Sequence, residues 1–239
     1  MAYELYYWPE IPGRGEFVRL ALEEAGAEYL DVARAPDGMT RMMAFLGSDA
    51  AVTHPPFAPP FLRDGPVLVG QTAAILFYLG PRLGLAPPDE AGQLWTHQLC
   101  LTVADLVAET HDTHHPVSGD LYYADQKAEA LRRARHFRSA RIPHFLGWFD
   151  TVLARNPAGP AHLAGGTLTT ADLALFQAVA GLSYAFPRAM RRHLAAVPRV
   201  AALHAAVAAR PRLADYLASD RRLPFSEEGV FRHYPELDG

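Results

Sequence analysis

The pattern of apolar residues changes near residue 81, and this change limits the folds that the chain can adopt. In the first 80 residues, short runs with a period of two alternate with helical runs. Strands are expected at 3–7, 28–32, 61–63 and 67–69, and helices at 16–25 and 72–79. Asp64-Gly65 stands between the last two strands as a hairpin signal. This order predicts an α/β unit built on a mixed four-stranded sheet.

Beyond residue 88, long segments rich in alanine and leucine replace the alternation. Helices are expected over roughly 89–114, 126–154, 170–184 and 198–209. No strand pattern interrupts them, so this half is expected to be an all-helical bundle. We therefore predict a first domain at 1–81, a linker at 82–88 that ends in two prolines, and a second domain at 89–239.

Charge and cysteine content argue against several classes of protein. The chain has 22 Lys and Arg against 26 Asp and Glu, a net charge of −4, so it lacks the basic excess that holds nucleic acid. No apolar run is long enough to span a bilayer, and the first residues lack the basic start of a secretion signal. A cytoplasmic protein without a membrane partner is expected. The single cysteine, Cys100, stands between two leucines and is expected to be a buried core thiol.

Four short motifs lie along nearly the whole chain. The run from Tyr7 to Gly15 joins a tyrosine, an aromatic residue and a short loop to Arg-Gly before a helix. Pro60 stands four residues before the hairpin turn, and Gln71, followed by a hydroxyl residue, stands six residues after it. Thr169 and Asp172 are spaced as a capping box at the start of a helix.

In order and spacing, these motifs resemble the cytosolic glutathione transferase family, and within it the tyrosine-type classes alpha, mu, pi and sigma. The resemblance implies a thioredoxin-like N-terminal domain, an all-helical C-terminal domain and a homodimer. It also implies glutathione as the co-substrate, a small hydrophobic electrophile as the second substrate, and a role in detoxification. Residues 209–219 also resemble the last helix of the family.

By this resemblance, Tyr7 corresponds to the catalytic tyrosine, which donates a hydrogen bond to the glutathione thiol. A free thiol has a pKa of about 8.5, so only a few per cent is ionised at neutral pH. A donor to the sulfur stabilises the thiolate. The loop here is longer than in the family, which leaves Tyr6 as an alternative. Neighbouring residues of a strand point to opposite faces, so only one of the two can face the ligand.

Other glutathione contacts follow from the same resemblance. Arg14 would add positive potential, and Gln71 and Thr72, at a helix N-terminus, would bind the γ-glutamyl carboxylate. Pro60 would follow a cis peptide bond, and the residue before it would pair its backbone with the cysteinyl part of glutathione. That residue is Pro59, which has no N–H, so one half of the pairing is missing.

Two further glutathione contacts are less clearly defined by the sequence. Asp105 resembles an acid that reaches across the dimer to the glutathione amine; the alternative is an unpaired acid on an exposed helix face. The glycine carboxylate of glutathione is often held by tryptophan and lysine in the family. Residues 34–56 contain neither, and the only lysine is Lys127. Arg41 is the remaining candidate cation.

The electrophile pocket is expected between the first loop and a histidine-rich helix end. Its candidate lining residues are Trp8, Ile11, Pro12, His111 and His115. By resemblance to the pi class, His115 would make the pocket polar or act as an acid toward the substrate. With His114, these histidines share a helix face, which raises a metal site as an alternative. No glutamate is spaced as in HExxH, so no metal is expected.

Three functions remain open on this scaffold. They are a conjugating transferase, a glutathione-dependent isomerase or peroxidase, and a non-catalytic ligand-binding relative. Tyr7 and Gln71 favour an enzyme, whereas the missing N–H of Pro59 favours the binding protein. A thiol–disulfide oxidoreductase is disfavoured because no cysteine stands at the start of the first helix.

Overall fold

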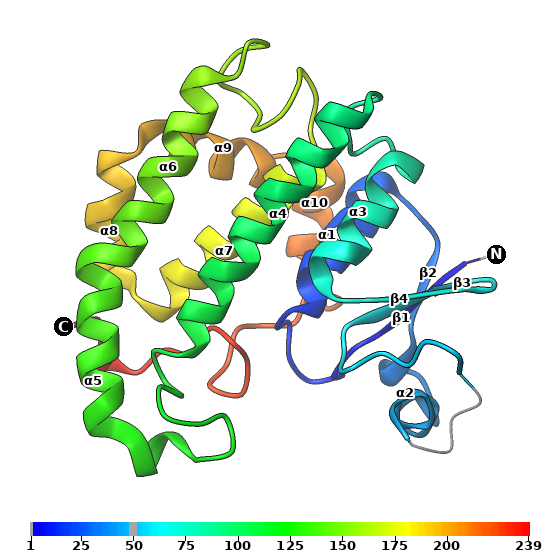
Figure 1. The fold of residues 1–239 in the computed structure, drawn as a ribbon, viewed down its shortest axis with the longest axis horizontal. Coiled ribbons are helices and arrows are strands. Elements are labelled where there is room, and N and C mark those ends of the chain that lie inside the picture. Colours follow the sequence, from blue (N-terminus) through cyan, green and yellow to red (C-terminus); the bar gives the residue numbers. More distant parts are fainter. Residues whose placement is uncertain (1, 48–51) are drawn as a thin grey trace.

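The structure, a computed structural model, describes residues 2–47 and 52–239. Figure 1 shows two regions side by side, one built on a small sheet and one built of helices only. The first region contains β1 (Tyr3–Tyr6), α1 (Gly15–Ala25), β2 (Tyr29–Asp31), the 3₁₀ turn η1 (Val32–Arg34), α2 (Gly38–Leu46), β3 (Phe61–Asp64), β4 (Val67–Gly70) and α3 (Thr72–Arg82). These bounds confirm the expected α/β order.

The sheet has four strands in the order β2-β1-β3-β4. β1 runs parallel to β2 and antiparallel to β3, which forms a hairpin with β4. Gly65 closes this hairpin with a φ of 57°, a conformation that glycine adopts without strain. The mixed sheet is therefore confirmed. β1 is shorter than expected, because it ends at Tyr6 and leaves Tyr7 in the following loop.

The two faces of the sheet bury different clusters of side chains. Leu5, on β1, packs with residues of α1 and α3. Tyr6, the next residue, packs on the opposite face with Met42 of α2 and with Phe61. This is the alternation that a strand imposes. Continued by one residue, it directs the Tyr7 side chain toward α1.

The second region consists of helices joined by loops, with no strand in the described residues from 83 to 239. It contains α4 (Glu90–His111), the 3₁₀ turn η2 (Tyr123–Gln126), α5 (Lys127–His136), the π-helical turn η3 (Phe137–Arg141), α6 (Ile142–Arg155), α7 (Thr170–Ala185), α8 (Pro187–Ala196), α9 (Pro198–Ala208), α10 (Pro211–Leu217) and α11 (Pro235–Asp238). The expected helix at 126–154 is interrupted by η3. α8 was not among the expected helices; it starts at a proline, a residue favoured at the first helical position.

α7 lies at the centre of the molecule and joins the two regions. It packs against α4 and α9 and also touches α1 of the first region. The capping box at its start is confirmed: the N–H and Oγ1 of Thr169 donate to Asp172 Oδ2 at 2.7 and 2.8 Å. The other oxygen of Asp172 accepts the N–H of Leu163 at 2.7 Å. One buried carboxylate therefore fixes both the helix start and the preceding loop.

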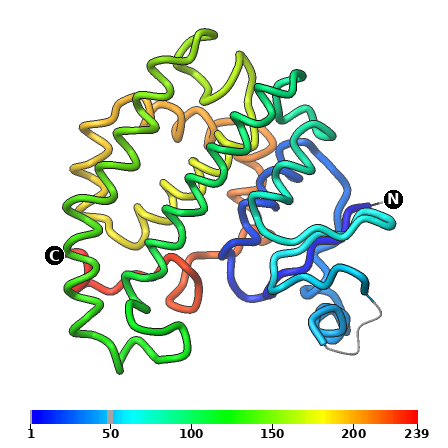
Figure 2. Tube along the Cα trace, in the orientation of Figure 1, coloured from blue at the N-terminus to red at the C-terminus, as the bar shows by residue number. Residues whose placement is uncertain are grey.

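An apolar core continues from α1 and α3 into α4 and α7. Cys100 lies within it, as expected, and burial raises the pKa of its thiol to about 12. After α10, the chain runs back along the helical region to α11, which packs against α5 and α8 (Figure 2). Among the described helices, none is both long and apolar enough to cross a membrane.

Candidate active site

Tyr7 lies directly after β1, and the loop that leads into α1 wraps its ring. The side chain is buried, and its hydroxyl oxygen accepts the backbone N–H of Arg14 at 2.8 Å. A Cβ atom added at Gly13 or Gly15 would lie closer than 3.0 Å to atoms of the Tyr7 side chain. Both glycines therefore allow the loop to approach the tyrosine. The position of the phenol is fixed by the backbone around it.

The environment of Tyr7 keeps the phenol protonated and leaves its proton free to donate. Burial raises the pKa of Tyr7, and the backbone N–H and the guanidinium of Arg14, with Arg19, only partly offset this rise. Because the oxygen already accepts a hydrogen bond from Arg14, the O–H can point elsewhere. This is the arrangement needed to donate a hydrogen bond to a sulfur atom.

Tyr6 is placed differently. It is 1% exposed, its hydroxyl donates to Glu4 Oε2 at 3.1 Å, and its ring stacks on Phe61 with centroids 4.5 Å apart. These contacts hold Tyr6 in the core between the sheet and α2. The hydroxyl proton of Tyr6 is therefore engaged, whereas that of Tyr7 is free.

The start of α3 offers a second polar group. Gln71 has a φ of 66°, a rare conformation for a residue other than glycine and one that often occurs at ligand sites. The first turn of α3 has no side-chain cap. Thr72 Oγ1 is buried without a hydrogen-bond partner in the described structure. Free N–H groups and an unpartnered hydroxyl at a helix N-terminus are suited to binding a carboxylate.

A cavity of about 380 Å³ opens beside these groups. It is lined by Arg14, Phe17, Gln71, Thr72, Ala73, Ala74, Leu76, His97, Cys100, Leu101, Val103, Ala104, Val107 and Ala174. α1 and α3 supply its polar end, and α4 supplies most of its apolar wall. Arg14 belongs to this lining and also donates its backbone N–H to Tyr7, so the tyrosine lies next to the cavity.

Pro59 and Pro60 precede β3. The bond between them is cis, as expected for Pro60. Pro60 is buried and Pro59 is half-buried. Since neither residue has an N–H, only their carbonyl groups are available for backbone pairing with a ligand.

The structure does not bring Arg41 to the cavity. Its Nη2 donates to Glu4 Oε1 at 3.0 Å, and Glu4 also accepts from Tyr6 and Arg63. These residues lie on the face of the sheet that α2 covers. Arg41 is therefore paired with an acid rather than free to clamp a carboxylate.

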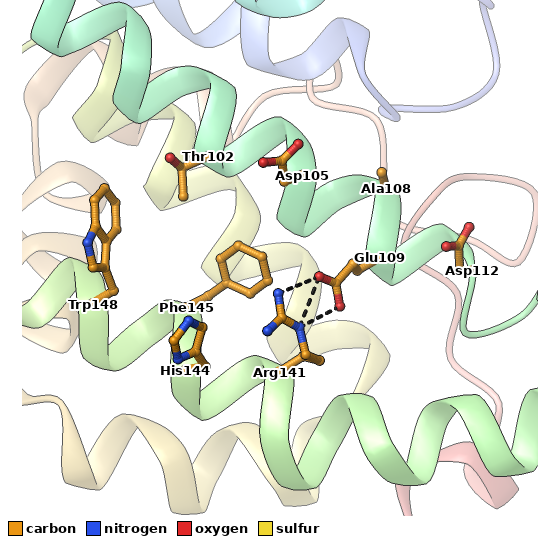
Figure 3. A pocket seen from close by; sticks show the side chains of 9 residues that line it. All are labelled: Thr102, Asp105, Ala108, Glu109, Asp112, Arg141, His144, Phe145 and Trp148. Atoms are coloured by element: carbon orange, nitrogen blue, oxygen red, sulfur yellow. Dashed lines mark hydrogen bonds and ion pairs between the residues drawn. The ribbon is translucent and has the colours of Figure 1, made fainter.

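Asp105 lines a different hollow from the one that Gln71 and Arg14 share. It is exposed in a groove of about 440 Å³ that α4 and α6 form, together with Phe145 and Trp148 (Figure 3). In the same groove, Arg141 binds both carboxylate oxygens of Glu109 at 2.7 to 3.0 Å. Within a single chain, Asp105 does not meet the other predicted glutathione contacts.

The residues predicted for the electrophile pocket fall into two groups. Trp8 is exposed, Ile11 is half-buried and Pro12 is buried; none of them lines the 380 Å³ cavity. His111 and His115 lie at the end of α4 and stack with ring centroids 4.9 Å apart. Burial lowers the pKa of both, to about 4 for His111, so neither is a proton donor at neutral pH.

Arg19 is a site residue that the sequence analysis missed. Its guanidinium is buried and donates to the Pro12 carbonyl, Glu16 and Asp31 at 3.3, 3.3 and 2.7 Å. It therefore ties the loop that carries Tyr7 to α1 and β2. A charged pair three residues apart within an apolar helix, Glu16 and Arg19, was the available signal.

Comparison with known proteins agrees with this architecture. Residues 111–220 match the family model for the C-terminal domain of glutathione S-transferase. The chain is 26% identical to glutathione S-transferase P 1 of Xenopus laevis over 224 residues, which cover 92% of this chain and 93% of that protein.

Two solved structures share the fold. A pi-class glutathione S-transferase of Onchocerca volvulus has a TM-score of 0.68 at 22% identity and covers 90% of this chain and 92% of its own. A prostaglandin synthase D of Nilaparvata lugens has a TM-score of 0.71 at 18% identity and covers 94% of this chain and 100% of its own.

The fold defines a two-domain protein with a thioredoxin-like N-terminal region and a helical C-terminal region. In sequence and in fold, the chain is similar to glutathione S-transferases, and its residues 111–220 match the C-terminal domain of that family.

Proposed function

We propose that the protein is a glutathione transferase in which Tyr7 stabilises the glutathione thiolate for attack on a small hydrophobic electrophile. One observation carries this proposal. The buried Tyr7 hydroxyl accepts the N–H of Arg14 and keeps its own proton free, beside a cavity that ends at an uncapped helix N-terminus. The similarity of the chain to glutathione S-transferases supports glutathione as the co-substrate.

The energetic demand on Tyr7 is moderate. Lowering a thiol pKa by about two units requires about 2.7 kcal/mol of differential stabilisation. A hydrogen bond to a charged group contributes about 1.5–3 kcal/mol. The thiol proton leaves to solvent, and the thiolate then forms a carbon–sulfur bond. In a displacement, the leaving group departs with its bonding electrons.

The start of α3 would hold the other end of glutathione. Gln71, the hydroxyl of Thr72 and the free N–H groups would bind the γ-glutamyl carboxylate, with Arg14 adding positive potential. The Pro59 carbonyl would accept from the cysteinyl N–H. Arg41 would reach the glycine carboxylate only by leaving Glu4.

We also propose a cytoplasmic homodimer without a nucleic-acid partner, acting in detoxification. Asp105 would then reach the glutathione of the partner subunit from its exposed position on α4. The net charge of −4 supports the absence of nucleic acid. Light scattering on a sizing column tests the dimer, and a monomer at working concentration would remove Asp105 from the site.

An isomerase using the same site is a second candidate. One solved structure with this fold is described as a prostaglandin synthase. A transferase consumes one glutathione per product, an isomerase returns it unchanged and a peroxidase oxidises it. Measuring free thiol during turnover separates these activities.

Steady-state kinetics of two tyrosine variants test the proposed catalyst. We expect Tyr7→Phe to lower kcat/KM for glutathione conjugation by about 100-fold, as the loss of an electrostatic donor typically does. Tyr6→Phe is the matched control, because its hydroxyl binds Glu4, and its kcat/KM is expected to stay within about 3-fold of wild type. Equal losses in the two variants would contradict the assignment.

A further inference from the structure

Three histidines gather where α4 ends. His111, His114 and His115 each bring a ring nitrogen to within 4.8 Å of the others. They lie one turn beyond Val107, which lines the 380 Å³ cavity, so they extend the α4 wall of that cavity. His114 Nδ1 lies 2.5 Å from His115 Nδ1, and all three rings pack with centroids 4.7 to 5.0 Å apart.

The orientation of His114 is set by a segment distant in sequence. Its Nε2 lies 3.0 Å from the carbonyl oxygen of Val230. Because a carbonyl only accepts hydrogen bonds, Nε2 carries the proton and Nδ1 presents its lone pair toward His115. Metal-binding histidines are commonly fixed in this way, with the second ring nitrogen donating to a backbone carbonyl.

The protonation state of the cluster suits a metal ion. Burial lowers the pKa of His114 to about 3, and burial, His115, Arg14 and Arg232 lower that of His111 to about 4. In a neutral imidazole one ring nitrogen carries no proton, and that nitrogen can bind a metal. The guanidinium groups of Arg14 and Arg232 repel a dication. An anionic ligand bound to the metal would offset this repulsion.

We propose that His111, His114 and His115 form a binding site for a divalent transition metal, with Zn²⁺ as the best fit and a fourth position open to an anionic ligand. Three histidines with one open position form a known type of zinc site, and imidazole suits zinc, copper and nickel. Two nitrogens bound to tetrahedral zinc lie about 3.3 Å apart. The Nδ1 atoms of His114 and His115, now 2.5 Å apart, would therefore separate by about 0.8 Å. The nitrogens of the cluster, which lie within 4.8 Å of one another, would shift by up to about 1.5 Å.

This proposal replaces the expectation of no metal that the sequence supported. That expectation relied on the missing HExxH glutamate, which a site of three histidines does not need. The packing of the rings and the carbonyl of Val230 are visible only in the folded chain.

The fourth ligand that we propose is the glutathione thiolate, a part of the inference that depends on the proposed function. A thiol that coordinates a dication is deprotonated. The thiol proton would leave to solvent as the sulfur–metal bond forms, without a change in oxidation state. The metal would thus add to the stabilisation that Tyr7 provides.

Cobalt titration of the chelator-treated full-length protein tests the site. We expect one Co²⁺ per chain, with the intense visible bands of a four-coordinate ion. His111→Gln and His115→Gln are expected to weaken cobalt binding at least about 10-fold. His136→Gln, an exposed histidine on α5, is the matched control and should bind as wild type does. Thermal melts verify that each variant folds. Equal cobalt binding in all four proteins, or none, would overturn the site.

Glutathione and S-methylglutathione then test the fourth ligand. A near-ultraviolet sulfur-to-cobalt band that appears with glutathione only, against a protein-free blank, supports the thiolate. If calorimetry detects bound glutathione and no such band forms, the thiolate is not the ligand. If glutathione does not bind, the proposed function fails, whereas the cobalt titration without glutathione still decides the metal site.

Discussion

The two regions of the molecule position their functional groups by different means. In the sheet-containing region, Tyr7, Pro60 and Thr72 lie where a strand or helix begins or ends, and neighbouring backbone fixes them. In the helical region, His114 lies just beyond α4 and is oriented by Val230, 116 residues away in sequence. The first arrangement depends on local backbone geometry and the second on packing. Substitutions near Tyr7 are therefore expected to act through the adjacent backbone, whereas substitutions in the helical region are expected to act through packing between distant segments.

The largest effect is expected where backbone approaches the tyrosine. Gly15→Ala adds a Cβ closer than 3.0 Å to the Tyr7 ring, so we expect about a 100-fold loss of kcat/KM from displacement of the phenol. Without this contact, replacing glycine by alanine in a helix stabilises the fold by about 0.5–1 kcal/mol. Gly147→Ala, in α6 with open space around it, is the matched control and should keep full activity. Activity retained in Gly15→Ala would contradict the local control of Tyr7.

A change in the helical region should affect stability instead. Asp172→Asn replaces one acceptor oxygen with an amide facing the N–H groups of Leu163 or Thr169. We expect the free energy of unfolding to fall by roughly 1–3 kcal/mol in urea titrations, with kcat/KM of the folded protein within a factor of about 3. Asp220→Asn, at an exposed site, should change the free energy of unfolding by less than about 0.5 kcal/mol. Equal stability of the two variants would contradict the claim that packing around Asp172 stabilises the helical region.

Thr72→Val separates binding from stability. The Thr72 hydroxyl is buried without a partner, so its removal should leave the melting temperature unchanged or raise it. Loss of a hydrogen bond to the glutathione carboxylate should weaken binding by about 10-fold in calorimetry. Thr151→Val, whose hydroxyl donates to the Gly147 carbonyl on α6, should leave affinity unchanged. Unaltered affinity in Thr72→Val would show that the glutathione carboxylate does not bind at the start of α3.

The smallest expected effect is on stability, and it concerns the ion pair of Glu109 in the groove between α4 and α6. Burial alone would raise the pKa of Glu109, but Arg141 and Arg133 outweigh it and lower that pKa. The pairing therefore stabilises the fold above the unfolded pKa of about 4.3 and is lost as the pH falls through the lower folded value. We expect Glu109→Gln to lower the free energy of unfolding by less than about 1 kcal/mol at pH 7 and to leave it unchanged in strong acid. Exposed Glu227→Gln is the control; a pH-independent difference would contradict this pairing.

Local signals made much of the first region predictable. The Asp64-Gly65 hairpin and the first helix follow from short motifs, and the cis bond before Pro60 follows from the resemblance to glutathione transferases; all three are confirmed. The capping box of Thr169 and Asp172 is also local and confirmed. Each of these features depends on residues a few positions apart.

Other features depended on contacts that no spacing reveals. Arg41 pairs with Glu4, 37 positions away. Arg19, on α1, donates to Asp31 at the end of β2, and the burial of Arg19 depends on the surrounding core. The histidine cluster was visible as a spacing, but the carbonyl that orients His114 was not. Packing between distant segments therefore decides the part of the site that the sequence left open.

The central claim is that Tyr7 stabilises the glutathione thiolate. Its most direct test is to titrate the ultraviolet thiolate absorbance of bound glutathione against pH in wild type and Tyr7→Phe. The account predicts a thiol pKa about two units below the free value of about 8.5 in wild type, returning toward the free value in the variant. A depressed pKa that survives in Tyr7→Phe would contradict the account and assign the stabilisation to another group.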